Sequence, residues 1–151
     1  MKIIFHLGWV ESAGGRRFFK SSAAGELFAD YQKRIQGFLP CEIAPAHDFS
    51  KPKPSGAAVW VCDFHERAKM LSSEDLAAKV DSLSLSSTKT LHIVIGGPDG
   101  FSDALRKNFK PDFLWSFGPM TLPHELAAVV ASEQIYRAWS ILRHQPYHTS
   151  H

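Results

Sequence analysis

Short apolar runs that alternate with helix-like stretches constrain the fold of this chain more than any other feature. The runs occur at Ile3–Leu7, Phe38–Ala44, Ala57–Asp63, Thr90–Ile95 and Asp112–Phe117. Short, continuous apolar runs are typical of strands that are covered on both faces. Their alternation with helices predicts an α/β fold with a mainly parallel sheet.

Four helices are expected between and after these strands. They cover about Phe18–Gln36, Ser72–Leu83, Ser102–Asn108 and Pro123–His144. Ser72 suits an N-cap, and proline suits a first helical turn. The segment His47–Gly56 is rich in proline and serine, which predicts a loop rather than a linker between domains. The expected order is therefore β-α-β-β-α-β-α-β-α in a single domain over residues 1–151.

Composition excludes several classes of protein. The net charge of +2 is too small to argue for nucleic-acid binding by itself. Two cysteines, Cys41 and Cys62, argue against a disulfide scaffold or a cysteine-based zinc site. Residues 1–10 lack the long apolar core of a signal peptide, and no run of about 18 apolar residues predicts a membrane span. We therefore expect a cytoplasmic protein that does not contact membranes.

The stretch Ile93–Phe101, IVIGGPDGF, ends an apolar run in a cluster of turn residues. It matches neither the G-x-G-x-x-G pattern nor a P-loop, so a ligand here is not expected to bind through phosphates. Ligands of open parallel sheets bind beyond the carboxyl ends of strands. Three loops leave such ends, at Cys62–Phe64, Gly96–Pro98 and Gly118–Pro123. The apolar side chains of the third loop either plug the core or hold something flat and apolar, such as an adenine ring.

The last predicted helix is apolar on more than one face, so it is either central in the monomer or partly covered by a second subunit. Glu133 and Arg137 are four residues apart on it and can pair. In the tail that follows, Tyr147 can stack on a base and His148 can move a proton near neutral pH. The tail histidines lack a carboxylate or cysteine that would complete a metal site, so we expect no metal.

Several motifs together resemble one family. The segments Ile95–Ser102, Trp115–Ile141 and Pro146–His148 carry Gly-Gly-Pro, Leu-Pro-His, Tyr-Arg-Ala-Trp-Ser and Pro-Tyr-His in order. Asp30–Arg34 and Ser72–Ala77 add weaker similarity. In these motifs the chain resembles the small SPOUT-class methyltransferases of the RlmH type. The resemblance implies an α/β fold with a C-terminal trefoil knot, which ordinary topology rules do not predict.

The resemblance also implies a function. It implies an enzyme of rRNA processing that methylates N3 of a pseudouridine in large-subunit (23S) ribosomal RNA, using S-adenosyl-L-methionine. Free rRNA or an assembled ribosome would be the substrate, and a homodimer would pack largely through the last helix. The residues implied in catalysis are His148, Arg137 and Tyr147. The residues implied in cofactor binding are Cys62, Gly96, Gly97, Gly118, Pro119, Met120, Thr121, Leu122 and Pro123.

The sequence also departs from the family pattern. Ala128 stands where relatives usually carry arginine, and Glu66 stands where they tend to carry glycine. The segment His47–Gly56 is shorter than usual and lacks an expected helix. Two alternatives therefore remain beside the enzyme: a protein of the same fold with another RNA target, and an inactive module that binds RNA or the ribosome.

Overall fold

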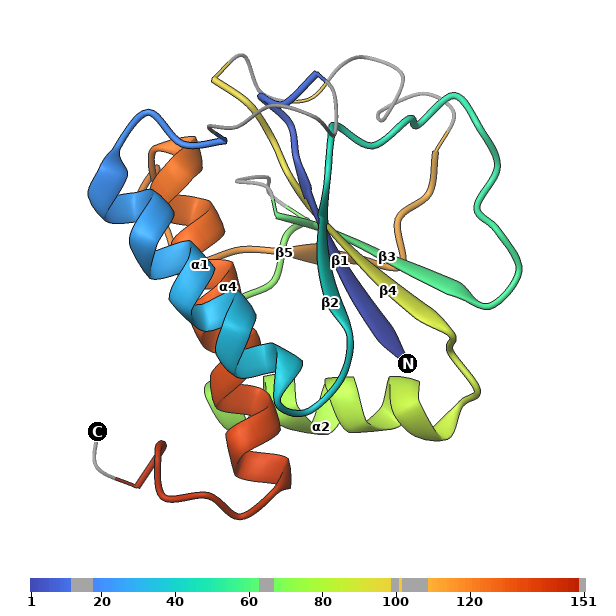
Figure 1. Ribbon diagram of the computed structural model, residues 1–151. Helices are drawn as coiled ribbons and strands as arrows, with labels where there is room; N and C mark the ends of the chain where they lie inside the picture. The colour runs from blue at the N-terminus through green and yellow to red at the C-terminus, as the bar shows by residue number, and fades with distance from the viewer. Residues whose placement is uncertain (12–17, 63–66, 99–100, 102–108, 150–151) are drawn as a thin grey trace.

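A five-stranded, wholly parallel sheet forms the centre of the molecule (Figure 1). The computed structural model describes residues 1–11, 18–62, 67–98, 101 and 109–149. The strand order is β2-β1-β4-β3-β5. The strands are β1 (Lys2–Leu7), β2 (Cys41–Ala44), β3 (Ala57–Cys62), β4 (Thr90–Ile95) and β5 (Phe113–Trp115). The predicted parallel α/β sheet is thus confirmed.

The described helices are α1 (Ser22–Gln36), α2 (Ser73–Leu85) and α4 (His124–Leu142). The helix expected at Ser102–Asn108 falls entirely outside the described residues. The start of α1 is later than expected because the side chain of Ser21 caps it by accepting a hydrogen bond from the amide of Ala24. β5 is shorter than expected, since Ser116 already turns the chain with its side chain bonded to Gly118.

Helices α1, α2 and α4 contribute to one large core against one face of the sheet. Ile3, Phe5 and Leu7 of β1 and Leu91, Ile93 and Ile95 of β4 belong to this core. The other face carries a smaller cluster of Phe49, Val59, Val61 and Val94, against which Phe101, Phe109 and Leu114 pack. This face is therefore covered by the connections from β2 to β3 and from β4 to β5, rather than by the described helices.

The two faces follow from the hand of the connections. The links from β1 to β2 and from β3 to β4 run toward the β2 edge, whereas the links from β2 to β3 and from β4 to β5 run toward the β5 edge. Right-handed crossovers in opposite directions lie on opposite faces of a parallel sheet. The segment 45–56, which contains no helix, must therefore cover the face opposite α1 and α2, as the position of Phe49 shows.

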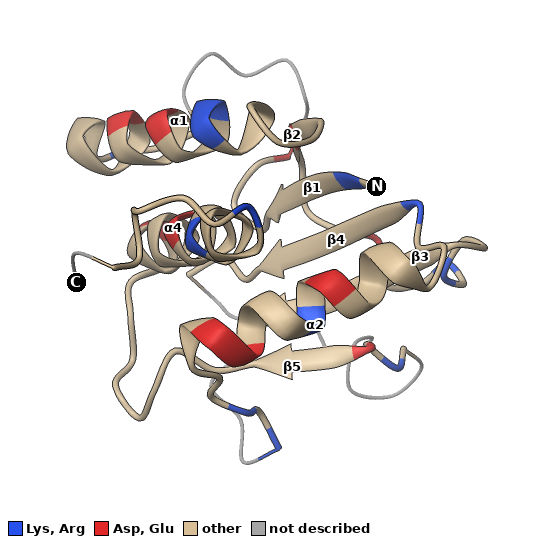
Figure 2. Cartoon of the chain, turned by 90° about the horizontal axis from the view of Figure 1, so that it is seen from below, with Lys and Arg blue, Asp and Glu red and all other residues tan. Residues whose placement is uncertain are grey.

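Helix α4 lies between α1 and α2 and contacts both of them (Figure 2). Ala128, Ala131, Ser132, Ile135 and Ala138 are fully buried within the single chain. A central helix therefore explains most of the apolar sequence here. Its first turn differs, because Leu126 is 44% exposed.

Charged residues of both signs occur on α1 and on α2 (Figure 2). Neither helix therefore offers a surface of a single sign to a nucleic acid. Within the described residues, no helix combines the length and the apolar composition needed to span a membrane.

Candidate active site

A cavity of about 550 Å³ opens at the carboxyl ends of β3, β4 and β5. Ligand pockets commonly have roughly 300–1,000 Å³ of volume, so this one is large enough for a nucleoside-sized molecule. Eight of the nine residues predicted to bind a cofactor line it: Cys62, Gly96, Gly97, Gly118, Met120, Thr121, Leu122 and Pro123. Pro119 belongs to the same loop but is not among the lining residues.

Eight further residues line the cavity that were not among those predicted to bind the cofactor. They are Ile95, Pro98, Phe101, Trp115, Ser116, Phe117, His124 and Ala127. Trp115 and Phe117 pack edge to face at a centroid distance of 4.9 Å. The aromatic residues at the end of β5 were the available signal, because Trp115 is the last residue of the strand and Phe117 follows two residues later, where the strand reaches the cavity.

Gly97 and Gly8 let two backbones approach closely beside the cavity. The amide of Gly8 donates a 2.8 Å hydrogen bond to the carbonyl of Ile95, which extends the β1–β4 pairing by one residue. A Cβ on Gly8 would lie 2.7 Å from the amide nitrogen of Gly97 and from the carbonyl oxygen of Ile95. A Cβ on Gly97 would lie 3.1 Å from the carbonyl oxygen of Gly8. The second glycine of the Gly-Gly-Pro motif thus fits the loop against β1.

Gly118 begins the third loop in a backbone conformation that favours glycine. Its φ of 122° lies in the left-handed half of the map. The hydroxyl of Ser116 accepts a 3.2 Å hydrogen bond from the amide of Gly118. The turn directs Met120, which is 74% exposed, away from the core. Of the two interpretations of this loop, a core plug is therefore wrong for Met120, whereas Leu122 is half-buried in the cavity wall.

The three residues predicted to act in catalysis form a second group, at the far end of α4. Arg137 donates to Oε1 of Glu133 from both Nε (3.0 Å) and Nη2 (2.6 Å). The hydroxyl of Tyr147 donates to the same oxygen at 2.9 Å. The side chains of Arg137 and Glu133 are only 13% and 18% exposed, so the predicted pair is stronger than one on the open surface.

His148 lies between this pair and helix α2. Nη1 of Arg137 donates to Nδ1 of His148 at 3.1 Å, because guanidinium has no acceptor. Nε2 of His148 therefore carries the proton, and it donates to Oε1 of Glu74 at 2.7 Å. This contact lowers the pKa of Glu74. Both ring nitrogens of His148 are thus engaged in this arrangement.

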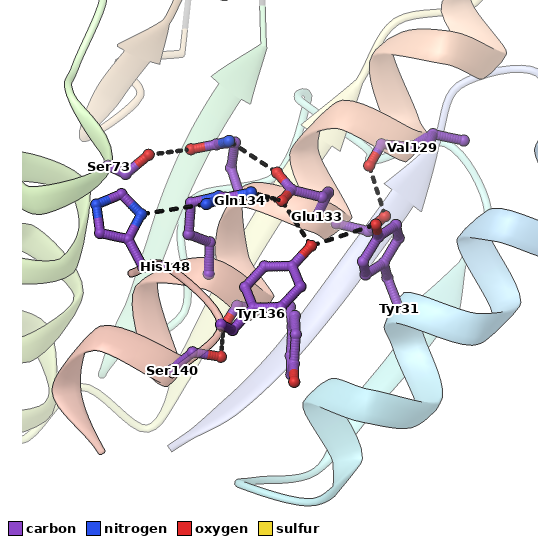
Figure 3. Close-up of polar contacts among 11 residues, drawn as sticks. Tyr31, Ser73, Val129, Glu133, Gln134, Tyr136, Ser140 and His148 are labelled. Carbon is purple, nitrogen blue, oxygen red and sulfur yellow. Dashed lines mark hydrogen bonds and ion pairs between the residues drawn. The ribbon is translucent and has the colours of Figure 1, made fainter. Parts of the chain in front are cut away.

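Further contacts tie the group to both neighbouring helices (Figure 3). Ser73 of α2 donates to the side-chain oxygen of Gln134 at 2.9 Å, and the Gln134 amide donates to Oε2 of Glu133 at 2.7 Å. Tyr31 of α1 lies 3.4 Å from the hydroxyl of Tyr147. Burial, Tyr31 and Glu133 raise the pKa of Tyr147, which keeps the phenol protonated. The sequence did not indicate Tyr31, Ser73 or Gln134, since their link to Glu133 depends on helix packing.

The residues predicted to act in catalysis and the cavity are separate within one chain. His124 lines the cavity at the first residue of α4, whereas Arg137 lies 13 residues further along the helix. At a rise of 1.5 Å per residue, they are roughly 20 Å apart along the helix axis. The structure therefore gathers each set of predicted residues but does not bring the two sets together in a single protomer.

Comparison with known proteins gives a consistent result. A family model described as "Predicted SPOUT methyltransferase" matches residues 18–148. Three similar proteins are each called "Ribosomal RNA large subunit methyltransferase H". The protein from Pelobacter propionicus is 34% identical over 82% of this chain and 88% of its own length. The protein from Deinococcus deserti is 44% identical over 79% and 85%, respectively. The match to the protein from Thioalkalivibrio sulfidiphilus is 41% identical but covers only 55% of this chain and 51% of that protein.

The family model covers most of the chain, including all the residues that line the cavity and the three residues predicted to act in catalysis. Membership of this family implies a methyl donor and an acceptor. The resemblance read from the motifs is therefore confirmed, and the chain belongs to the SPOUT methyltransferase family.

Proposed function

We propose that this protein transfers a methyl group from S-adenosyl-L-methionine to N3 of a pseudouridine in large-subunit ribosomal RNA. The observation that carries the proposal is the cavity at the carboxyl edge of the sheet, which is lined by Cys62 at the end of β3 and by residues of the loops Gly96–Pro98 and Gly118–Pro123. Residues 63 and 64, the rest of the first expected loop, lie outside the described residues. The names of the similar proteins support a large-subunit rRNA as acceptor.

The lining of the cavity suits this donor. Apolar side chains from Leu122, Ile95 and Ala127 can cover an adenine ring, and the glycine loops present backbone groups that can bond its edge. Helix α4 begins at His124 on the cavity wall, and a helix N-terminus favours the carboxylate of the methionine part. When bound, S-adenosyl-L-methionine supplies an electrophilic methyl group on a sulfonium.

The residues of the chain would then position the acceptor and stabilise its charge. The N3–H bond of pseudouridine must break as the new N–CH₃ bond forms, while the S–CH₃ electron pair stays on sulfur. The guanidinium of Arg137 can stabilise the imide anion or hold a phosphate, and Tyr147 can stack on a base. The contact with Glu133 raises the pKa of Arg137 against the effect of burial, so the guanidinium stays charged.

His148 is the candidate acceptor of the N3 proton. To take it, Nδ1 must exchange its contact with Arg137 for one with the base, while Nε2 keeps Glu74 as a partner. A carboxylate on Nε2 stabilises the imidazolium that forms. Glu74 therefore acts as a positioning residue in this proposal.

The proposal includes a homodimer and a knotted C-terminal region. The distance along α4 between the cavity and Arg137 supports a site that is shared between two subunits.

The direct test is methyl transfer from labelled S-adenosyl-L-methionine to ribosomes from a strain that lacks the corresponding gene. Mass spectrometry of the nucleosides is expected to show one N3-methylpseudouridine per large subunit. Label on a different nucleoside would show that the protein is a methyltransferase with another RNA target. Donor binding without transfer to ribosomes or to free rRNA would favour an inactive RNA-binding module.

Donor binding can be tested separately with a bulky side chain at the cavity wall. Gly96→Leu is expected to reduce affinity for S-adenosyl-L-methionine at least tenfold in calorimetric titration, since a Cβ there already lies 3.1 Å from the ring of Phe101. Gly37→Leu makes the same change at the exposed end of α1, where φ is −67°, and should leave binding intact. Equal affinities for S-adenosyl-L-methionine in the wild type, Gly96→Leu and Gly37→Leu would show that the cavity is not the donor site.

Shared sites can be tested by mixing two inactive variants. Gly96→Leu damages the cavity, and Arg137→Met damages the catalytic group. If each site combines the cavity of one subunit with Arg137 of its partner, half of the randomly mixed dimers contain one intact site. Mixing is then expected to restore about a quarter of wild-type activity. No recovery, with mixed dimers demonstrated by mass spectrometry, would place both parts in one chain.

A further inference from the structure

Three histidines from separate segments meet on the sheet face opposite α1 and α4. His6 lies on β1, His92 on β4, and His47 on the connection from β2 to β3. One nitrogen of each ring lies within 4.8 Å of the corresponding atoms of the other two. His6 is 9% exposed, while the other two are half-buried. The cluster plays no part in the cavity or in the catalytic group.

The strand register makes the first two members neighbours. His92 pairs with Ile4 and Val94 pairs with His6, so both imidazoles leave the same face on adjacent strands. Nε2 of His6 lies 2.8 Å from Nδ1 of His92. The ring of His47 packs at 4.9 Å from that of His6 and at 5.8 Å from that of His92. Three ligand atoms therefore converge with little rearrangement of the backbone.

Hydrogen bonding prepares His6 as a ligand. Nδ1 of His6 lies 3.0 Å from the carbonyl oxygen of Pro45, which can only accept, so Nδ1 carries the proton. Nε2 of His6 then offers a lone pair toward His92 and His47. A carbonyl that fixes the tautomer and orientation of a ligating imidazole is the usual outer partner of a metal-bound histidine. Burial is the main cause of a lowered pKa at all three histidines, so the rings are neutral at pH 7.

We propose that His6, His47 and His92 bind one Zn²⁺ ion, with water as the fourth ligand. Neutral imidazole is a preferred zinc ligand, and three nitrogens with one open position make a common tetrahedral set. Zn–N bonds of roughly 2.0–2.1 Å require ligand nitrogens about 3.3 Å apart. The His6–His92 pair must therefore open by about 0.5 Å, and His47 must move inward.

Binding also requires a change of tautomer at His92. Nδ1 of His92 now donates to Nε2 of His6, and zinc would take the place of that proton. The proton moves to Nε2 of His92 through solvent, which leaves the ring neutral. Asp48, which follows His47 in the sequence, is bonded to Ser50 and paired with Lys51, so it is not counted among the ligands.

The ion would fasten the connection 45–56 to the two central strands. This segment lacks the helix expected from the family pattern, and it holds Phe49 in the second core cluster. The ring of Phe49 packs edge to face on His47 and on Phe109. Zinc on His47 would therefore anchor the covering layer of this face without taking part in methyl transfer.

The experiment uses chelator-treated full-length protein with Zn²⁺ and Co²⁺ as probes. We expect one Zn²⁺ per chain by calorimetry, and a rise in Tm of about 5–10 °C at a free zinc concentration 100 times the Kd. Co²⁺ should give the intense visible absorption of a tetrahedral site. Methyl transfer should not change on zinc addition.

Variants identify the ligands. His47→Ala and His92→Gln are each expected to reduce zinc affinity at least tenfold and to abolish the cobalt spectrum, with metal-free unfolding curves as a check of folding. His47→Gln is a second variant at the loop position. His144→Ala removes an exposed histidine after α4 and should change neither the zinc affinity nor the cobalt spectrum. Absence of saturable zinc binding, or equal affinity in the cluster variants and wild type, would overturn the proposal.

Discussion

Gly8→Ala is expected to destabilise the protein by about 3 kcal/mol, at the upper end of the usual cost of overpacking. The new methyl group would lie 2.7 Å from two backbone atoms, on Ile95 and Gly97, and backbone cannot rotate away as a side chain can. The β1 and β4 ends must therefore separate where the Gly-Gly-Pro loop begins. Equilibrium denaturation measures the loss.

The same variant should weaken donor binding, because Gly97 and Ile95 line the cavity. We expect the affinity for S-adenosyl-L-methionine to fall at least tenfold, or about 1.4 kcal/mol. Gly37→Ala is the matched control, since Gly37 is exposed and has a φ of −67°, and it should stay within about 0.5 kcal/mol of wild type. Wild-type stability and donor affinity in Gly8→Ala would contradict the close approach of the two backbones.

Arg137→Met is expected to lower kcat for methyl transfer by roughly 10²–10³, the usual effect of losing one donor that stabilises developing charge. Arg137→Lys should not restore activity. Lysine presents a point charge, whereas Arg137 uses Nε, Nη1 and Nη2 in a planar arrangement toward Glu133 and His148. Single-turnover methylation of ribosomes measures both variants.

Stability separates a catalytic role from a structural one in this variant. Loss of Arg137 leaves the partly buried carboxylate of Glu133 with Tyr147 and Gln134 as donors, so we expect a cost of about 1–2 kcal/mol. Lys2→Met breaks an exposed pair with Glu42 and should cost less than about 0.5 kcal/mol without affecting activity. A kcat near that of wild type for Arg137→Met would show that Arg137 has no catalytic role.

Local patterns predicted the elements well where a single residue sets the boundary. The range Thr90–Ile95 was predicted without error, because turn residues follow it directly. Gly37 ends α1 as expected. Errors occurred at Phe38–Ala44, of which only Cys41–Ala44 pairs with β1, because an edge strand extends only as far as its one neighbour bonds it. The trefoil knot stays a prediction. Passage of the C-terminal segment through a loop leaves no trace in the spacing of apolar residues along the sequence.

The candidate site was predictable as two groups of residues but not as an arrangement. Loops that follow parallel strands meet at one edge, so the loops expected at the cavity could be found from the strands, and the resemblance to the family then named the residues in them. Glu74, Ser73 and Tyr31 lie near the residues predicted to act in catalysis only because α2 and α1 pack on either side of α4. The three histidines are 41 and 45 residues apart in the sequence, and only the strand order brings them together.

The pairing of β1 with β4 has a consequence for the folding of the chain during its synthesis. β1 is the second strand in the sheet order, yet Lys2 pairs with Thr90, a separation of 88 residues. At translation rates of about 5–20 residues per second, the first strand to leave the ribosome waits roughly 4–18 s for this partner. Until then Ile3, Phe5 and Leu7 lack one side of their final surroundings. During this interval the apolar side chains of β1 are exposed on the growing chain, a state that is prone to aggregation.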